Sequence, residues 1–567
     1  MKSMIAVCAW VLVAVMVAGE ARAELRAWTV TQTRRVLRDE GPGNERAAAI
    51  SAARNEWESF QVFVRSDVAA KISDVRLEEL KGPDGAAIRE PNIMLYREHQ
   101  LELTIPTHRN DTFKAGWYPD ALIPFKHPLT RVPLPKARFT AVPFDLPASE
   151  THGFWVDVHV PTDAKAGEYR GILRVMVQGG AMVETPVTLT VWGFALPAVP
   201  TLQTAFGSPA GRMRSYYREL AKTQKWAESP DWPAIETQCA AMLSDNRINA
   251  TPPSGTLTPQ AQPDGSFRIP PERLKELLEF VDRYHVNAVQ IPHPEGVVKD
   301  PVAERTKLHA WLKAFDVAAA ELNRPGLVFF TYLKDEPNDE AAYRYVQKWG
   351  KAIREAKSVV KVMVVEQTWT QNEAWGDLYG AVDIWCPLFS LHKQDSADRR
   401  IALGETVWTY TALCQGQPTP WWHTDFPLLN YRVPAWMAWQ AHMRGLLYWG
   451  GMSYWSQVKD VWTDPKTYDR RKEGKGNLWN GEGSFVYPGR DCGYDGIAPS
   501  LRLKALRDSV EDYEYMAILD RAGKAEEARK VVGAVAGSFF TWDEDPGAYQ
   551  KARAELAQMI LKAGGAK

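Results

Sequence analysis

Bulky apolar and polar positions alternate with a period of two over residues 24–200. Short segments of this kind occupy residues 60–64, 154–160, 167–177 and 187–192. Gly, Pro and Asp separate them, and the polar positions between the apolar ones could face water. We therefore predict an N-terminal antiparallel β-sandwich over residues 24–200, with Pro197 and Pro200 marking its end.

The pattern changes to alternating strands and helices over residues 201–495. Apolar segments typical of strands occupy residues 202–206, 286–291, 327–333, 362–366, 383–388, 407–413 and 445–449, with a weaker one near 247–251. Amphipathic stretches that favour helices occupy residues 271–284, 306–321 and 340–356. Seven or eight such units predict a (β/α)8, TIM-like barrel.

The remaining residues, 496–567, have a helical pattern. Leu503, Leu506 and Val510 recur at steps of three and four, and Arg507 and Glu511 form an i,i+4 pair. We predict a C-terminal helical region, divided by Gly523 and Pro546.

Composition narrows the classes of function. The chain has 68 Lys and Arg against 69 Asp and Glu, a net charge of -1, which argues against a nucleic-acid partner. Of 23 tryptophans, 12 lie between Trp369 and Trp479. Such density indicates either a large aromatic core or stacking platforms for the flat faces of a ligand.

The first 23 residues have the pattern of a secretory signal peptide. Lys2 precedes an uncharged apolar run at residues 5–18, and Ala21-Arg22-Ala23 resembles a cleavage site. The run is short for a membrane span. We therefore expect cleavage after Ala23, a secreted or periplasmic protein, and no membrane span after cleavage.

An acidic pair follows the most apolar strand of the predicted barrel. Residues 327–333 lead into Lys334-Asp335-Glu336-Pro337, and Pro337 ends the strand. Chemistry in such barrels lies at the carboxyl ends of the strands, and two carboxylates in one cleft tend to separate in pKa. The alternative is that these acids merely begin the next helix, since acidic residues favour helix N-termini.

Glu366, after the strand at 362–366, is the main rival to this pair. In the usual barrel glycosidase arrangement, a second carboxylate lies about 5 Å from the first, on a distant strand. The strand at 407–413 ends without one. This absence favours a mechanism in which the substrate supplies its own nucleophile.

Several side chains near strand ends are candidates for binding a sugar. Trp408 and Tyr410 share one face of a strand, Trp449 ends another, and Trp439 lies between them in the sequence. His293 comes just after the strand at 286–291 and could bond a sugar hydroxyl. We expect no metal and no cofactor, because HExxH, clustered Cys/His and glycine-rich nucleotide motifs are all missing from the sequence.

Motifs along nearly the whole chain resemble glycoside hydrolase family 123 and its wider relatives, the domain of unknown function 4091 group. The motifs are Gly116-Trp117-Tyr118-Pro119-Asp120, Phe154-Trp155-Val156-Asp157-Val158, Tyr332-Leu333-Lys334-Asp335-Glu336-Pro337, Val407-Trp408-Thr409-Tyr410-Thr411, Gly445-Leu446-Leu447-Tyr448-Trp449, Gly483-Ser484-Phe485-Val486-Tyr487-Pro488-Gly489 and the segment 502–515. Their order and spacing carry the resemblance.

The resemblance implies a retaining β-N-acetylgalactosaminidase-like enzyme with substrate-assisted catalysis. Glu336 would be the acid/base, and Asp335 would stabilise the 2-acetamido group as it attacks the anomeric carbon. Tyr410 would then bond the acetamido oxygen, with Trp449 or Trp439 below the sugar. The partner would be an oligosaccharide or glycoconjugate. Two alternatives stay open: a neutral-sugar glycosidase with Glu366 as nucleophile, and a carbohydrate-binding surface protein without activity.

Overall fold

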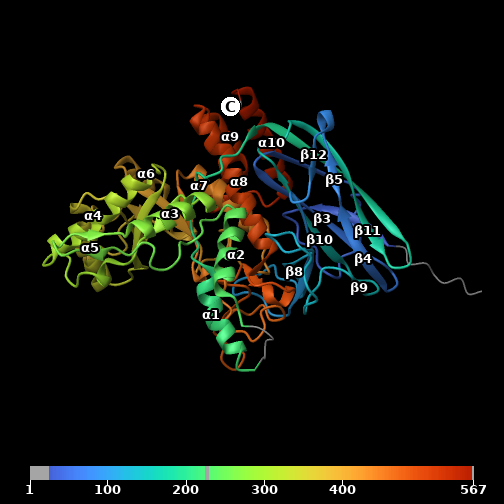
Figure 1. Cartoon of the computed structure of the whole chain (residues 1–567), viewed down its shortest axis with the longest axis horizontal. Coiled ribbons are helices and arrows are strands. Elements are labelled where there is room, and N and C mark those ends of the chain that lie inside the picture. Colours follow the sequence, from blue (N-terminus) through green and yellow to red (C-terminus); the bar gives the residue numbers. More distant parts are fainter. Residues whose placement is uncertain (1–24, 224–228, 565–567) are drawn as a thin grey trace, which may run out of the picture.

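The computed structural model describes residues 25–223 and 229–564 of the chain. Figure 1 shows the N-terminal strands on one side, the helices α3 to α6 on the other, and the C-terminal helices between them. The predicted signal peptide and its cleavage site lie outside the described residues. Within the described residues, no helix is long and apolar enough to cross a membrane.

Two sheets form the N-terminal part. The first is antiparallel, in the order β1 (Arg26–Thr31), β3 (Glu56–Arg65), β10 (His152–Val160), β7 (Ile93–Leu103), β8 (Gly116–Pro124). The second has the order β2 (Ala48–Arg54), β12 (Met182–Ala195), β11 (Gly167–Val177), β4 (Ala70–Leu77), β9 (Phe144–Leu146), with β5 (Glu79–Lys81) and β6 (Ala87–Arg89) at its side. The prediction of antiparallel sheets is confirmed, except that β2 runs parallel to β12.

The first sheet is covered on both faces, which corrects one expectation. Phe154 and Val156 of β10 pack against residues of the second sheet, as predicted. Asp157, which follows Val156 and was expected to face water, is fully buried, as is Ser59 of β3. These positions meet helix α8 (Leu501–Arg521) instead of solvent. The alternation therefore separates an apolar face from a polar buried one.

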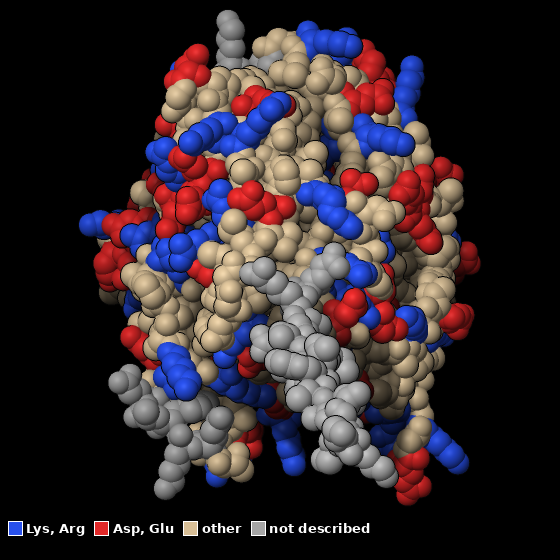
Figure 2. Space-filling view, turned by 90° about the vertical axis from the view of Figure 1, so that its right-hand side faces the viewer, with Lys and Arg blue, Asp and Glu red and all other residues tan. Residues whose placement is uncertain are grey.

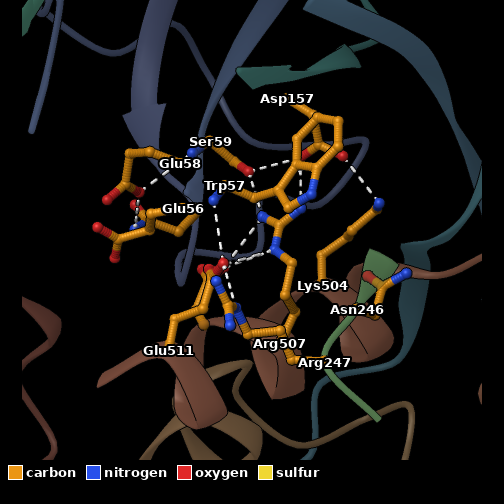
Figure 3. Close-up of polar contacts among 12 residues, drawn as sticks. Glu56, Trp57, Glu58, Ser59, Asp157, Asn246, Arg247, Lys504, Arg507 and Glu511 are labelled. Carbon is orange, nitrogen blue, oxygen red and sulfur yellow. Dashed lines mark hydrogen bonds and ion pairs between the residues drawn. The ribbon is translucent and has the colours of Figure 1, made fainter. Parts of the chain in front are cut away.

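A buried charge network joins this sheet to α8 (Figure 3). Lys504 Nζ lies 2.8 Å from one carboxylate oxygen of Asp157, and Arg507 lies 3.1 Å from the other. Burial alone would raise the pKa of Asp157, but these two cations hold it well below its usual range. Glu511 accepts hydrogen bonds from the backbone of Trp57 and from Arg247. The predicted Arg507–Glu511 pair is confirmed at 3.7 Å.

Seven parallel strands form the nearly closed barrel of the central part. Their order is β13 (Gln203–Ala205), β21 (Gly445–Leu447), β20 (Thr406–Tyr410), β19 (Ile384–Trp385), β18 (Lys361–Val365), β17 (Val328–Asp335), β16 (Ala288–Gln290). The helices around them are α1 (Pro209–Leu220), α2 (Trp232–Asp245), α3 (Pro271–Tyr284), α4 (Arg305–Leu322), α5 (Glu340–Glu355), α6 (Gln394–Ala402) and α7 (Leu429–Gln440). The seven stronger strand predictions are confirmed.

The weaker eighth strand, predicted near residues 247–251, is absent from the described residues. Arg247 has a left-handed backbone (φ 56°), and Pro252 and Pro253 follow, so this segment cannot extend regularly. The Asn249 side chain spans the gap instead. Its amide donates to Thr204 O (2.9 Å) and to the side chain of Asn287 (2.7 Å). Side-chain bonds thus replace a strand between β13 and β16.

Three helices and several hairpins complete the fold. The predicted C-terminal helices are α8, α9 (Ala525–Val535) and α10 (Pro546–Lys562). The hairpins are β14 (Gln260–Ala261) with β15 (Phe267–Arg268), β22 (Tyr468–Asp469) with β23 (Leu478–Trp479), β24 (Val486–Pro488) with β25 (Ile497–Pro499), and β26 (Ala536–Ser538) with β27 (Thr541–Trp542). Cys239, Cys386, Cys414 and Cys492 are all free thiols.

The surface over the N-terminal sheets has mixed charge. Figure 2 shows Lys and Arg interspersed with Asp and Glu across the described part of this face. A surface that binds a polyanion is continuously basic, and the described part of this face is not. The mixture of charges agrees with the near-zero net charge of the chain.

Candidate active site

Asp335 is directed toward the barrel mouth by an irregularity in β17. The pairing of β17 with β18 shifts between Tyr332 and Lys334, so Leu333 is an extra residue in the ladder. In a regular strand, residues three apart point to opposite faces; the extra residue reverses this relation. Tyr332 and Asp335 consequently lie together, and the Tyr332 hydroxyl donates to Asp335 Oδ1 at 2.7 Å.

Glu336 has an unusual backbone conformation. Its φ is 36°, in the left-handed region that side chains other than glycine rarely adopt. Such residues cluster at functional sites and cost about 1–3 kcal/mol. The Tyr410 hydroxyl donates to Glu336 Oε1 from the end of β20. Each carboxylate of the pair is therefore held by its own tyrosine.

The acidic pair does not begin the next helix. Helix α5 starts at Glu340, and its N-cap is Asp339, whose carboxylate accepts from the backbone of Ala342 at 2.8 Å. Asp335 and Glu336 precede this cap and are exposed at the strand end. The alternative that these acids serve only as a helix start is therefore wrong.

A cavity of about 220 Å³ lies at the carboxyl ends of β13, β16 and β21. Tyr332, Trp449 and Tyr448 line it together with backbone around Gly450. Because Tyr332 also binds Asp335, that carboxylate lies next to the cavity wall. A space of this size suits one sugar ring. Two larger cavities, of about 740 and 630 Å³, are lined by residues elsewhere, and neither acid lines any of the three cavities directly.

Trp449 is fixed by a buried carboxylate. Its indole N–H donates to Glu482, which is 1% exposed. The other Glu482 oxygen lies 2.6 Å from His423 Nε2, and the Tyr448 hydroxyl also donates to Glu482. Ring orientation at the cavity is therefore set from beneath by Glu482.

Three of the predicted sugar-binding residues have other surroundings. His293 Nε2 donates to Leu333 O (3.2 Å) and its Nδ1 accepts from Glu295 N, so the ring supports the irregular part of β17. Trp439 is buried in α7 under the guanidinium of Arg529. Trp408 lies inside the barrel against Phe330, and lines none of the cavities described. The structure thus places Tyr410 against Glu336 and Trp449 at the cavity, Trp408 and Trp439 in the core, and His293 against the backbone of β17.

Two important side chains were missed in the sequence. Tyr332 shares a face with Asp335 only because of the extra residue at Leu333, which the alternation rule does not anticipate. Glu482 lies in a glycine-rich loop that is far along the sequence from any barrel strand. In the sequence, only its position in Gly481-Glu482-Gly483 indicates a special role.

Glu366, the rival nucleophile, is 5% exposed directly after β18. Burial and, to a smaller extent, the neighbouring Glu336 raise its pKa to about 8, although a 3.1 Å hydrogen bond from Tyr343 opposes the rise. At neutral pH the group is therefore mostly protonated, and a protonated carboxyl is a poor nucleophile.

We expect Glu366→Gln to retain most turnover and to change the pH dependence of stability. The folded pKa lies above the ordinary 4.5, so the stabilising contribution of Glu366 is fully present below about pH 4.5 and is lost as pH rises through about 8. The glutamine variant lacks this slope of about 1.4 kcal/mol per pH unit. Urea unfolding of variant and parent at several pH values would measure it, with exposed Glu355→Gln as control. Complete loss of turnover would instead favour Glu366 as nucleophile.

In the described part of the chain, no group of three or more His, Cys, Asp or Glu side chains is arranged to hold a metal ion.

A family model matches the part of the chain that contains the acidic pair. Residues 303–519 match the family model described as glycoside hydrolase 123, catalytic domain. This segment includes the acidic pair, Tyr410, Trp449 and Glu482. The resemblance inferred from the motifs is confirmed, and the match supports a glycosidase.

One solved structure shares the fold over nearly the whole chain. A family 123 glycoside hydrolase from Clostridium perfringens, studied for glycolipid glycan hydrolysis, has a TM-score of 0.63 at 12% identity, covering 95% of this chain and 97% of that one. A family 39 glycoside hydrolase from Bacteroides cellulosilyticus WH2 has a TM-score of only 0.30 at 8% identity, covering 76% and 82%. No curated protein matches the sequence.

Proposed function

From the match of residues 303–519 to the catalytic domain of glycoside hydrolase 123, we propose that this chain is an exported, retaining glycosidase. It removes a terminal β-linked 2-acetamido sugar, with N-acetylgalactosamine as the first candidate. The observation that carries the proposal is the adjacent pair Asp335 and Glu336, each bound by a tyrosine. Of these two tyrosines, Tyr332 also lines a cavity that suits one sugar.

Glu336 is the acid and base of the proposed reaction. In the first step its carboxyl proton passes to the glycosidic oxygen as the bond to the anomeric carbon breaks. The carbonyl oxygen of the substrate's own acetamido group bonds to that carbon and closes an oxazoline-type ring. Water then loses a proton to Glu336 and attacks the same carbon, which restores the acetamide and the original anomeric configuration.

Asp335 stabilises the acetamido group in both steps. The nitrogen of that group becomes positive as its carbonyl oxygen attacks, and a carboxylate beside it lowers the energy of the charge. Tyr332 orients Asp335 through the 2.7 Å hydrogen bond. Burial raises the pKa of Tyr332 and of Tyr410, and the adjacent carboxylates raise it further, so both hydroxyls stay protonated as donors.

Tyr410 supports Glu336 in the free enzyme, since its hydroxyl already donates to that carboxylate. We had predicted it as a ligand of the acetamido oxygen. Binding of the sugar would require the hydroxyl to exchange one acceptor for the other, so the two roles belong to different stages of the reaction.

We expect Asp335→Asn to lower kcat for an aryl 2-acetamido-β-galactoside by about 10²- to 10³-fold, the usual loss for one preorganised electrostatic group. Asparagine keeps the size and can still accept from Tyr332, so the fold should survive. Steady-state kinetics with exposed Asp395→Asn of α6 as control would test this. Near-parental kcat in Asp335→Asn would remove the proposed role of the acetamido group.

The neutral-sugar alternative has less support, because the raised pKa of Glu366 disfavours an ionised nucleophile. The alternative of a binding protein without activity has no specific observation in its favour, since the acidic pair and its tyrosines are all present. The relative from Clostridium perfringens suggests glycolipid glycans as natural substrates. The predicted signal peptide supports a site of action outside the cytoplasm.

A further inference from the structure

Three partly buried aromatic rings form a continuous surface beside the candidate sugar cavity. Trp449 lies 5.1 Å from Tyr454 and 5.9 Å from Tyr468, and those two tyrosines lie 5.7 Å apart, between ring centroids. Trp449 also lines the cavity. The aromatic surface therefore begins at the cavity and continues toward the hairpin of β22 and β23.

Two arginines lie over these rings. The guanidinium of Arg212, at the start of α1, is 5.8 Å from the Trp449 ring and 5.0 Å from the Tyr454 ring. The guanidinium of Arg470 is 5.0 Å from the Tyr468 ring. Stacking of this kind holds each cation close to the aromatic surface.

Neither arginine has a carboxylate partner among the described residues. The arginine next along the chain shows the contrast, because Arg471 binds Asp469 at 2.7 Å. Arg470 donates only to the hydroxyl of Tyr468, and Arg212 has only the ring contacts. Both guanidinium groups are thus available to an external anion.

The turn between β22 and β23 adds to the positive charge. Arg470, Arg471, Lys472 and Lys475 are accompanied in this turn by one acid, Glu473. The balance of charge within the turn itself is therefore basic, whereas the chain as a whole is near neutral. Such a local surplus attracts acidic ligands.

We propose that Trp449, Tyr454 and Tyr468, with Arg212 and Arg470, form a subsite for a second sugar that carries an anionic substituent. This inference rests on the proposed function, since the terminal sugar of the same glycan occupies the cavity. The ring planes of Tyr454 and Tyr468 differ by 31°, so these two rings can pack against one face of the second sugar, with Trp449 steeply inclined to both. The guanidinium groups bind a carboxylate, sulfate or phosphate through paired N–H donors. The preferred substrates are accordingly acidic glycans.

Binding to matched oligosaccharides tests the subsite. The probes have a terminal β-N-acetylgalactosamine and an internal sugar that carries a carboxylate, a sulfate, a phosphate or no charge. Tryptophan fluorescence of the full chain with Glu336→Gln would report binding without turnover. We expect at least one acidic probe to bind about tenfold more tightly than the neutral probe, and the tightest of the three identifies the anion.

The variant Arg212→Gln/Arg470→Gln should lose this preference, whereas Arg218→Gln, an exposed arginine on the same helix α1, should keep it. Equal binding of acidic and neutral probes, or an unchanged preference in the double variant, would overturn the subsite. Hydrolysis of an aryl 2-acetamido glycoside by the parent tests the proposed function separately, because that substrate has no second sugar. Acid-dependent binding without hydrolysis would support the subsite while contradicting the proposed function.

Discussion

Glu336→Gln should lower kcat by about 10²- to 10⁴-fold, the range usual for loss of a general acid or base. The glutamine side chain has the same shape and can still accept from Tyr410, so the geometry around it should persist. It can neither give a proton to the glycosidic oxygen nor take one from water. The loss should therefore be largest for substrates whose leaving groups need protonation, and smaller for nitrophenyl glycosides.

Single-turnover and steady-state kinetics with alkyl and nitrophenyl 2-acetamido-β-galactosides would measure this difference. Glu340→Gln, at the exposed start of α5 only four residues along the chain, is the matched control. Its ion pair with Arg344 lies at the surface, so its loss should leave kcat near the parental value. Equal kcat values for Glu336→Gln and Glu340→Gln would exclude Glu336 as the acid/base.

Arg507→Met should destabilise the fold by about 3–5 kcal/mol. Arg507 is fully buried and contacts Asp157 and Glu511 (Figure 3), and it also contacts Asp508. Removal of one partner leaves these carboxylates buried with less compensation. Lys504 still neutralises Asp157 in part, which favours the lower end of this range.

Urea unfolding would measure the change in free energy. Arg273→Met is the matched control, because Arg273 forms an exposed i,i+3 pair with Glu276 on α3. A pair of this kind contributes about 0.5 kcal/mol or less. If the two methionine variants lost equal stability, the buried network would not be what secures α8 to the N-terminal sheet.

The sequence pattern predicted the helices and the stronger strands because burial on one side imposes a clear period. Helix α3 was predicted at its observed bounds, whereas β19 is shorter than the apolar run at 383–388. The prediction of an eighth strand was wrong, because the left-handed backbone of Arg247 and the prolines that follow it prevent regular pairing. Burial of Asp157 depends on α8, hundreds of residues away, which alternation within one strand cannot reveal.

The acidic pair could be found from the sequence because a proline-terminated apolar strand delivers it to the barrel rim. The side chains that position Asp335 and Trp449 could not be found from the sequence. Tyr332 depends on one extra residue in β17, and Glu482 depends on a loop that folds back beneath Trp449. The tryptophan density also has two explanations in the structure: Trp408 and Trp439 are core residues, while Trp449 lies at the cavity.

The central claim is that the substrate's acetamido group acts as the nucleophile. Inhibition of the parent chain by an N-acetylgalactosamine-derived thiazoline, a stable mimic of the oxazoline-type intermediate, tests it most directly. We expect competitive inhibition of aryl 2-acetamido-β-galactoside hydrolysis, with a Ki at least about 10²-fold below the KM, as for other mimics of high-energy species. Hydrolysis that is insensitive to the thiazoline, with equal rates on the matching 2-hydroxy galactoside, would contradict the account.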